Sequence, residues 1–304
     1  MMNKQEIREH LTGPIPSIRT PFFQDGEIDY GALRIMIDAA IDAGARTVLL
    51  TAGDSHYLCL SDEEIAEVTR VTCEHTAKRA MVVAADRYHS THRAVEWAKQ
   101  AAEMGADVAM CMPPDWAGSC TPETLAAHYA AVAKIQPVMI VTNVFVPRGI
   151  EFGLQTVELA LDQSENIVAI KDDMCGEFAR RLCLLAHERC AIFAGGQKQN
   201  HMNMLPYGCD GYLSTLLTFM PYIANRYWTS VASKELEVAR EVIREVDMPL
   251  FDYLAKLRGG FDAGIHAIYE HHGMAERWRR PPYYSLNDEE MKKLEDFLKQ
   301  HSLL

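Results

Sequence analysis

The stretch 167–171 has the sequence IVAIK, a short and continuous apolar run that ends in a lysine. Runs of this kind, rich in β-branched residues, are typical of parallel strands that are buried on both faces of a sheet. Similar runs occur at residues 15–20, 47–51, 81–85, 108–112, 138–142, 192–194 and 212–214. The sequence therefore predicts eight parallel strands.

Helical patterns fill the intervals between these runs. Residues 33–41 place apolar side chains at helical spacing. Ser61 and Glu64 form a capping-box pattern, and Thr121 followed by Pro122 is a typical helix start. Strands that alternate with helices leave two folds open, a closed (β/α)₈ barrel and an open doubly wound sheet.

Two observations favour the barrel. No G-x-G-x-x-G motif follows an early strand, as an open dinucleotide-binding sheet would require. Eight units over about 230 residues also match the usual barrel size. We predict an α/β protein with a (β/α)₈ TIM barrel at residues 1–232 and a C-terminal helical segment at residues 233–304. That segment should form helices at 235–246, 248–269 and 287–301 and pack on the barrel, since no Ser- or Gly-rich linker precedes it.

Charge and composition narrow the range of partners. The net charge of −12 disfavours binding to nucleic acid or to an anionic membrane. We find neither a signal peptide nor a run of about 18 apolar residues, so we expect no membrane span and a cytoplasmic location. The eight cysteines include no C-x-x-C pair, and we expect reduced thiols, no metal and no cofactor.

Lys171 is the strongest candidate for chemistry. Active sites of (β/α)₈ barrels lie at the carboxyl ends of the strands, where this lysine ends an apolar run. Burial favours the neutral form of an amine, and a neutral amine attacks a ketone to form a Schiff base. The pattern leaves a second interpretation open, a structural ion pair between Lys171 and Asp172 or Asp173.

Five segments, in their order and spacing, are similar to one known family. They are 13–22 (GPIPSIRTPF), 25–29 (DGEID), 51–55 (TAGDS), 168–172 (VAIKD) and 280–290 (RPPYYSLNDEE). Together they resemble the dihydrodipicolinate synthase / N-acetylneuraminate lyase family of class I aldolases. The resemblance implies a TIM barrel, Lys171 as the Schiff-base nucleophile and a 2-keto acid as substrate.

The resemblance also implies a loop that binds the substrate carboxylate. Thr51, Ala52, Gly53 and Asp54 occupy its positions. Ala52 stands where the family has a second threonine of its proton relay, and Asp54 replaces a glutamate. The family's proton relay is therefore incomplete in this chain.

Thr142 stands where the family has its proton-transferring tyrosine. A threonine hydroxyl is shorter and less acidic, so acid–base work has to involve another group or a water molecule. The candidates, in order, are Asp115, Asp54, Asp86, His56 and Tyr57. We predict Lys171, Thr142 and Asp115 as the catalytic residues.

Further substrate contacts are expected around the rim. Arg148 resembles an arginine that binds a substrate carboxylate in some members, although a solvated loop charge explains it equally well. Gly195, Gln197 and Leu213 match the loops after strands 7 and 8 and would contact the distal part of the substrate. Glycines in such loops would also suit a phosphate group.

The leading hypothesis is a Schiff-base aldolase or dehydratase that acts on pyruvate or a 2-keto sugar acid. Trp116 and Phe145 favour a bulky or apolar partner substrate, with core packing as the alternative. By resemblance we expect a homodimer or homotetramer. The rival lysine for the Schiff base is Lys198, which we predict to be a solvated helix start.

Three other functions stay open. One is a non-catalytic keto-acid binder, and another is authentic 4-hydroxy-tetrahydrodipicolinate synthase activity, against which the missing tyrosine and threonine argue. The third is a metal-dependent barrel lyase that uses rim carboxylates. Those carboxylates are Asp54, Asp86, Asp115, Asp172 and Asp173.

Overall fold

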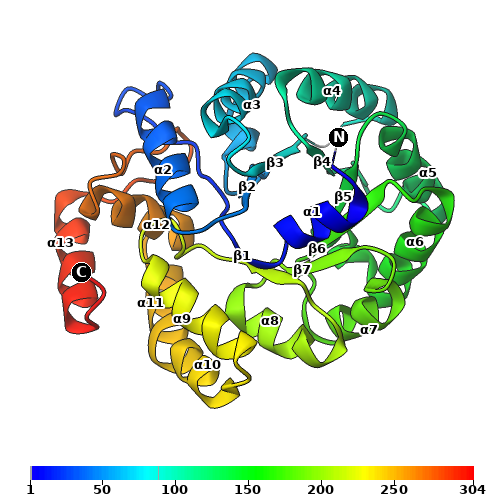
Figure 1. Cartoon of the computed structure of the whole chain (residues 1–304). Coiled ribbons are helices and arrows are strands. Elements are labelled where there is room, and N and C mark those ends of the chain that lie inside the picture. Colours follow the sequence, from blue (N-terminus) through cyan, green and yellow to red (C-terminus); the bar gives the residue numbers. More distant parts are fainter. Residues whose placement is uncertain (1, 88) are drawn as a thin grey trace.

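The structure is a barrel of parallel strands enclosed by a ring of helices (Figure 1). It is a computed structural model that describes residues 2–87 and 89–304. The strands are β1 Gly13–Ile15, β2 Thr47–Leu49, β3 Met81–Ala85, β4 Val108–Cys111, β5 Val138–Val141, β6 Ile167–Asp172, β7 Ala191–Ala194 and β8 Gly211–Leu213. The predicted (β/α)₈ TIM barrel is confirmed.

The barrel closes between its first and second strands. The strand order is β1-β8-β7-β6-β5-β4-β3-β2, in which each neighbour is hydrogen-bonded. A parallel bridge then joins Ser17 to Leu49, and Ile18 N–H donates to the Leu49 carbonyl at 2.9 Å. Because all the paired strands run parallel, their carboxyl ends lie at one rim of the barrel.

Helices cover the outer surface of the barrel. The helices before the C-terminal segment are α1 Lys4–His10, α2 Tyr30–Asp42, α3 Asp62–Thr76, α4 Thr91–Met104, α5 Pro122–Ala133, α6 Ile150–Gln163, α7 Gly176–Ala186, α8 Gln197–Met204 and α9 Pro221–Ala232. Short turns are η1 Tyr57–Cys59, η2 Thr142–Arg148 and η3 Leu205–Tyr207. Helix α1 lies across the amino-terminal end of the barrel against β6 (Figure 1). The predicted capping box of Ser61 and Glu64 and the start at Thr121 and Pro122 are present.

The C-terminal segment is helical but more broken than we predicted. It contains α10 Leu236–Val242, the π-helical turn η4 Ile243–Asp247, α11 Met248–Lys256, α12 Gly260–His271 and α13 Asp288–Gln300. The predicted single helix at 248–269 is wrong, because the chain extends at Leu257 and Gly259 adopts a left-handed conformation with φ +82°. Glycine takes this conformation without steric cost.

This segment shares its core with the barrel. Leu250 and Ile265 belong to the same buried cluster as Ile140 and Ile170 on the strands. The segment therefore packs on the barrel as a unit, with α10 against α9 and with α13 against α12 at the outer edge (Figure 1). The division into two domains stays a prediction.

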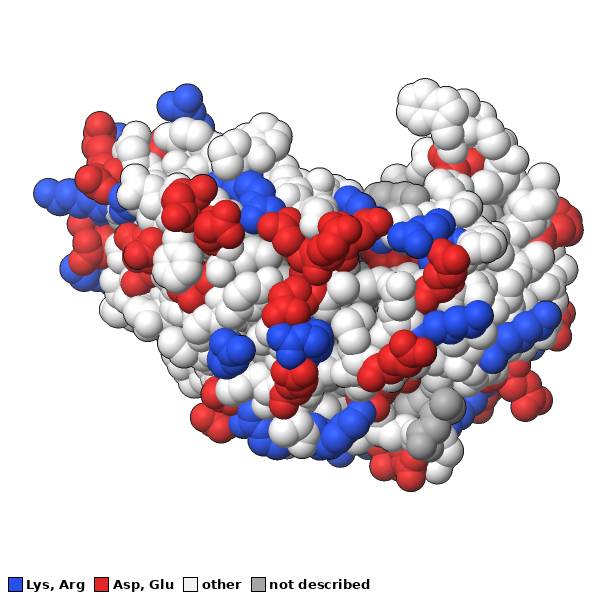
Figure 2. Space-filling model, turned by 90° about the horizontal axis from the view of Figure 1, so that it is seen from above, with Lys and Arg blue, Asp and Glu red and all other residues white. Residues whose placement is uncertain are grey.

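The surface carries both signs of charge. In Figure 2, acidic and basic side chains are interspersed over the visible face rather than gathered by sign. All eight cysteines are free thiols. Among the described residues, no helix combines the length and the apolar character that a membrane crossing needs.

Candidate active site

A cavity of about 370 Å³ opens at the carboxyl-terminal rim of the barrel. This is the end where barrel enzymes carry their active sites. Eight of the residues that we predicted line it, namely Thr51, Ala52, Gly53, Asp54, Lys171, Gly195, Gln197 and Leu213. The ends of β2, β6, β7 and β8 thus bring these residues together from distant parts of the sequence.

Lys171 lies in the wall of this cavity. It is the fifth residue of β6, between Val141 of β5 and Phe193 of β7. Only 7% of the residue is exposed. Its Nζ forms an ion pair with the Asp173 carboxylate, which also lines the cavity. An ammonium in such an ion pair has to lose a proton before it can attack a carbonyl as an amine.

The two acidic residues after Lys171 face in different directions. Successive side chains of a strand alternate between its faces, so Asp173 returns to the face of Lys171. Asp172 is fully buried and accepts hydrogen bonds from Asn200 Nδ2 at 2.9 Å and Thr142 Oγ1 at 3.0 Å. Burial raises the pKa of Asp172, and these hydrogen bonds oppose the rise. These contacts give the Asp172 carboxylate a structural role, in which it holds Asn200 and Thr142 in position.

Thr142 lies behind the cavity wall rather than in it. Its hydroxyl donates to Asp172 and accepts from the Asp173 backbone N–H at 2.8 Å. The side chain is completely buried. Since its proton is already engaged, we do not include Thr142 in the proposed chemistry.

Asp115 and Arg148 pair with each other outside the cavity. Arg148 also stacks over the Phe152 ring, with its Cζ 4.0 Å from the ring centroid. Partial burial would raise the pKa of Asp115, but hydrogen bonds from Cys120 and Arg148 outweigh it and lower that pKa. The structure does not bring this pair to Lys171, and both roles stay predictions.

The other predicted acid–base candidates differ in whether they line the cavity. Burial raises the pKa of Asp86 well above its usual value, and the Met112 N–H donates to its carboxylate at 3.0 Å. His56 and Tyr57 are buried and are absent from the described lining of the cavity. Within that described lining, the carboxylates belong to Asp54 and Asp173.

Two functional neighbours were missed by the sequence reasoning. Arg19, beyond the end of β1, lines the cavity, and its Nη2 lies 3.6 Å from Asp54 Oδ1. A charged residue inside the apolar run 15–20 was the available signal. Phe261 reaches the cavity from α12, which no local pattern could have indicated.

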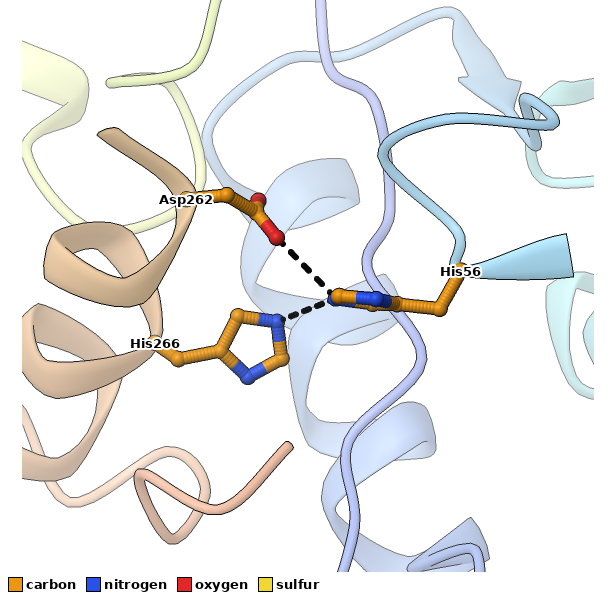
Figure 3. Close-up of side chains that lie close together, drawn as sticks. All are labelled: His56, Asp262 and His266. Atoms are coloured by element: carbon orange, nitrogen blue, oxygen red, sulfur yellow. Dashed lines mark hydrogen bonds and ion pairs between the residues drawn. The ribbon is translucent and has the colours of Figure 1, made fainter. Parts of the chain in front are cut away.

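Three potential metal ligands, His56, Asp262 and His266, lie close together (Figure 3). His56 Nε2 lies 2.8 Å from His266 Nε2 and 3.2 Å from Asp262 Oδ2. However, Asp262 already accepts from Arg19 Nε at 2.7 Å and from Arg279 Nη2 at 2.8 Å. Two guanidinium charges on one carboxylate oppose the binding of a divalent cation. We therefore assign this cluster to holding Arg19 in place.

The rival lysine is not at a solvated helix start, and that prediction is wrong. Lys198 is completely buried, and its Nζ pairs with Asp247 at 2.7 Å. Burial lowers the pKa of Lys198, and the Asp247 charge opposes this. Asp247 lies in η4, so the C-terminal segment supplies the partner that the local sequence could not show.

The two aromatic residues that suggested an apolar substrate also lie elsewhere. Trp116 is 87% exposed, whereas Phe145 is fully buried against Phe152. Neither belongs to the described lining of the cavity. They give no support to an apolar partner substrate.

A larger cavity, of about 510 Å³, lies at the opposite end of the barrel. Lys4, Arg8 and Glu165 are among its lining residues, and Arg8 Nε contacts Asp210 at 3.3 Å. Barrel enzymes use the other rim, so we place the chemistry beside Lys171.

Comparison with known proteins extends this description. A sequence model of the dihydrodipicolinate synthetase family matches residues 10–301. The chain is 30% identical over 251 residues to a 4-hydroxy-tetrahydrodipicolinate synthase of Ruthia magnifica subsp. Calyptogena magnifica, covering 81% of each protein.

Two solved structures have the same fold. A putative dihydrodipicolinate synthetase from Pseudomonas aeruginosa aligns with a TM-score of 0.83 and 25% identity, over 96% of this chain and 99% of that one. The N-acetylneuraminate lyase from Fusobacterium nucleatum aligns with a TM-score of 0.83 and 17% identity, over the same shares of the two chains. The second likeness concerns the fold alone.

Fold, site and comparisons together define a barrel enzyme of the lyase class. The chain belongs to the dihydrodipicolinate synthetase family. The departures from the family pattern that the resemblance indicates include Ala52, Asp54 and Thr142.

Proposed function

We propose that this protein is a Schiff-base lyase that acts on pyruvate or a 2-keto sugar acid through Lys171. The observation that carries the proposal is a buried lysine at the end of β6 that lines a cavity at the catalytic rim. Membership of the family supports the same assignment. No group outside the chain is needed for the imine chemistry.

A lysine amine that condenses with a 2-keto acid forms a positively charged iminium, and this intermediate makes the reaction possible. Its positive nitrogen withdraws electrons from the neighbouring carbon, so a carbon–carbon or carbon–oxygen bond beyond that carbon can break or form. Aldol cleavage, aldol condensation and dehydration all share this intermediate. The reaction therefore depends on which substrate fits the rest of the cavity.

The loop after β2 offers a site for the keto-acid carboxylate. Within the described part of the chain, the backbone N–H groups of Ala52 and Gly53 make no hydrogen bond. Consecutive free N–H groups of this kind form an anion-binding concavity. The Thr51 hydroxyl accepts from the Asp54 N–H at 3.0 Å, which fixes the turn.

The cavity lining contains polar side chains as well as apolar ones. The polar ones include Asp54, Asn143, Gln197 and Thr215, and Gln197 Nε2 donates to Thr215 Oγ1 at 2.8 Å. Side chains that can donate and accept suit the hydroxyl groups of a sugar acid. We therefore propose a 2-keto-3-deoxy sugar acid as the substrate.

The test is turnover of a panel of 2-keto-3-deoxy sugar acids, together with pyruvate and a panel of aldehydes. We expect activity with at least one member, and Lys171→Ala should lower it about 10⁴-fold or more. Lys293→Ala is the control, because that exposed lysine of α13 pairs with Glu289 on the surface.

Three results would contradict the assignment. Turnover that survives in Lys171→Ala excludes the lysine as nucleophile, and loss of activity with EDTA would favour the metal-dependent alternative. Imine formation without turnover of any panel member would favour the non-catalytic binder. Authentic 4-hydroxy-tetrahydrodipicolinate synthase activity is less favoured, since Ala52 and Thr142 replace residues of the family's proton relay.

We also propose a cytoplasmic homodimer or homotetramer. The loop after β4 exposes Trp116, and Val146 in η2 is 57% exposed. Pro114 and Pro147 line an open hollow of about 330 Å³ beside them. Exposed apolar groups of this kind are common at subunit contacts.

A further inference from the structure

We propose that Asp173 is the acid–base residue of this site, which takes a proton from Lys171 and delivers it to the substrate oxygen as the imine forms. The inference rests on the proposed Schiff-base function. It assigns to this chain a proton carrier in place of the family's tyrosine, at a position that the family resemblance did not indicate.

The first support is contact. The Asp173 carboxylate touches Lys171 Nζ and lines the same cavity. Its side chain is 22% exposed, compared with 9% for the lysine side chain. A group that touches both the nucleophile and the open cavity has the reach that proton transfer in both directions requires.

The second support is how firmly the carboxylate is positioned. The Asp173 N–H donates to the fixed Thr142 hydroxyl at 2.8 Å. On the other side, Gly195 leaves room for the side chain, since a Cβ at Gly195 would lie 2.9 Å from Asp173 Cγ and even closer to its Oδ1. A side chain at residue 195 would therefore displace the carboxylate.

The third support is that the other nearby polar groups, Thr142 and Asp54, already have partners of their own. Thr142 already donates its proton to Asp172. Asp54, the other carboxylate of the described lining, faces the Arg19 guanidinium across 3.6 Å. Asp173 is thus the carboxylate that has Lys171 as its partner.

The proton balance closes without another reagent. Asp173 first accepts a proton from the ammonium, and the neutral amine attacks the substrate C2, so that an N–C bond forms while the C=O π bond breaks. One nitrogen proton moves to the oxygen and gives a carbinolamine. Asp173 then donates its proton to the hydroxyl, water leaves, and the iminium forms with the Asp173 carboxylate restored.

An ion pair without catalytic function makes the opposite prediction. If Asp173 only held Lys171 charged, its removal would increase the fraction of neutral amine, and imine formation would become faster or stay unchanged. If Asp173 carries the proton, its removal slows imine formation. The sign of the effect therefore separates the two roles.

The experiment measures the rate of imine formation with pyruvate by rapid mixing and borohydride trapping. Asp173→Asn should lower this rate by about 10²- to 10⁴-fold, with the adduct still on Lys171. Asp173→Ala should behave alike and regain rate in proportion to added formate, which restores a carboxylate in the vacated space. Asp162→Asn is the control, because it removes an exposed carboxylate that pairs with Arg189 on the outer surface.

Circular dichroism and thermal melting establish that the variants are folded. An equal or higher rate in Asp173→Asn overturns the proposal, as does a loss in Asp54→Asn that Asp173→Asn does not share. Failure of formate to restore any rate in folded Asp173→Ala also counts against it. If the unmodified protein forms no imine, the proposed function itself fails, which is a distinct result.

Discussion

Gly195 has no side chain, and the Asp173 carboxylate occupies the space that a side chain would take. The substitution Gly195→Ala leaves all ionisable groups in the protein but displaces one of them, the Asp173 carboxylate. The new Cβ would also lie 2.9 Å from the Asp172 carbonyl oxygen, which cannot retreat easily because Asp172 ends β6. We expect imine formation with pyruvate to slow about 10²-fold, since displacements near 1 Å have effects of this size.

The rate is measured by the same trapping assay, and Gly31→Ala serves as control. A Cβ at Gly31 would meet only the Asp29 side chain, at 3.1 Å, which caps the start of α2. An unchanged rate in folded Gly195→Ala would mean that the position of Asp173 is not important for the chemistry.

The sequence predicted much of this rim because strand ends converge in a closed barrel. Residues 51–54 and 195–197 needed only their place after an apolar run. Asp173 was within reach of the same reasoning, since residues two apart on a strand share a face. Arg19 was not, because its partners Asp54 and Asp262 come from distant parts of the chain.

At the scale of elements, the buried pair of Lys198 and Asp247 links α8 to η4. Lys198→Met removes the positive charge and leaves a buried carboxylate without its partner. Breaking a buried pair from one side costs about 3–5 kcal/mol. We expect the free energy of unfolding, measured by chemical denaturation, to fall by that amount.

The double variant Lys198→Met/Asp247→Leu provides the control. Replacing both charges by apolar groups of similar size is often neutral. It should therefore recover most of the lost stability. A loss below about 1 kcal/mol in the single variant would show that water reaches this pair.

Element ends illustrate what local patterns can predict. The capping boxes at Ser61 and Asn287 form as their sequences indicate, because each uses residues three apart. The break between α11 and α12 occurs at Gly259 inside an otherwise helical pattern. Gly260 follows directly and also adopts a left-handed conformation, with φ +74°. Paired glycines are a turn signal, so the sequence did indicate this break, and the helical spacing on either side of it led to the wrong prediction.

At the scale of the whole molecule, the repeated strand and helix units determine the barrel, and the barrel determines where chemistry can occur. The C-terminal helices contribute Phe261 to the cavity and Asp262 to the support of Arg19. Tertiary contacts across about 240 positions of sequence create this part of the site. Local sequence patterns contain no record of such contacts.

The central claim is that the Lys171 amine condenses with a keto acid. The most direct measurement is reduction with borohydride in the presence of pyruvate, followed by peptide mass spectrometry. We predict one reduced pyruvate adduct, located on Lys171 and absent from Lys171→Ala. An adduct on Lys198, or one that persists after Lys171 is replaced, would contradict the account.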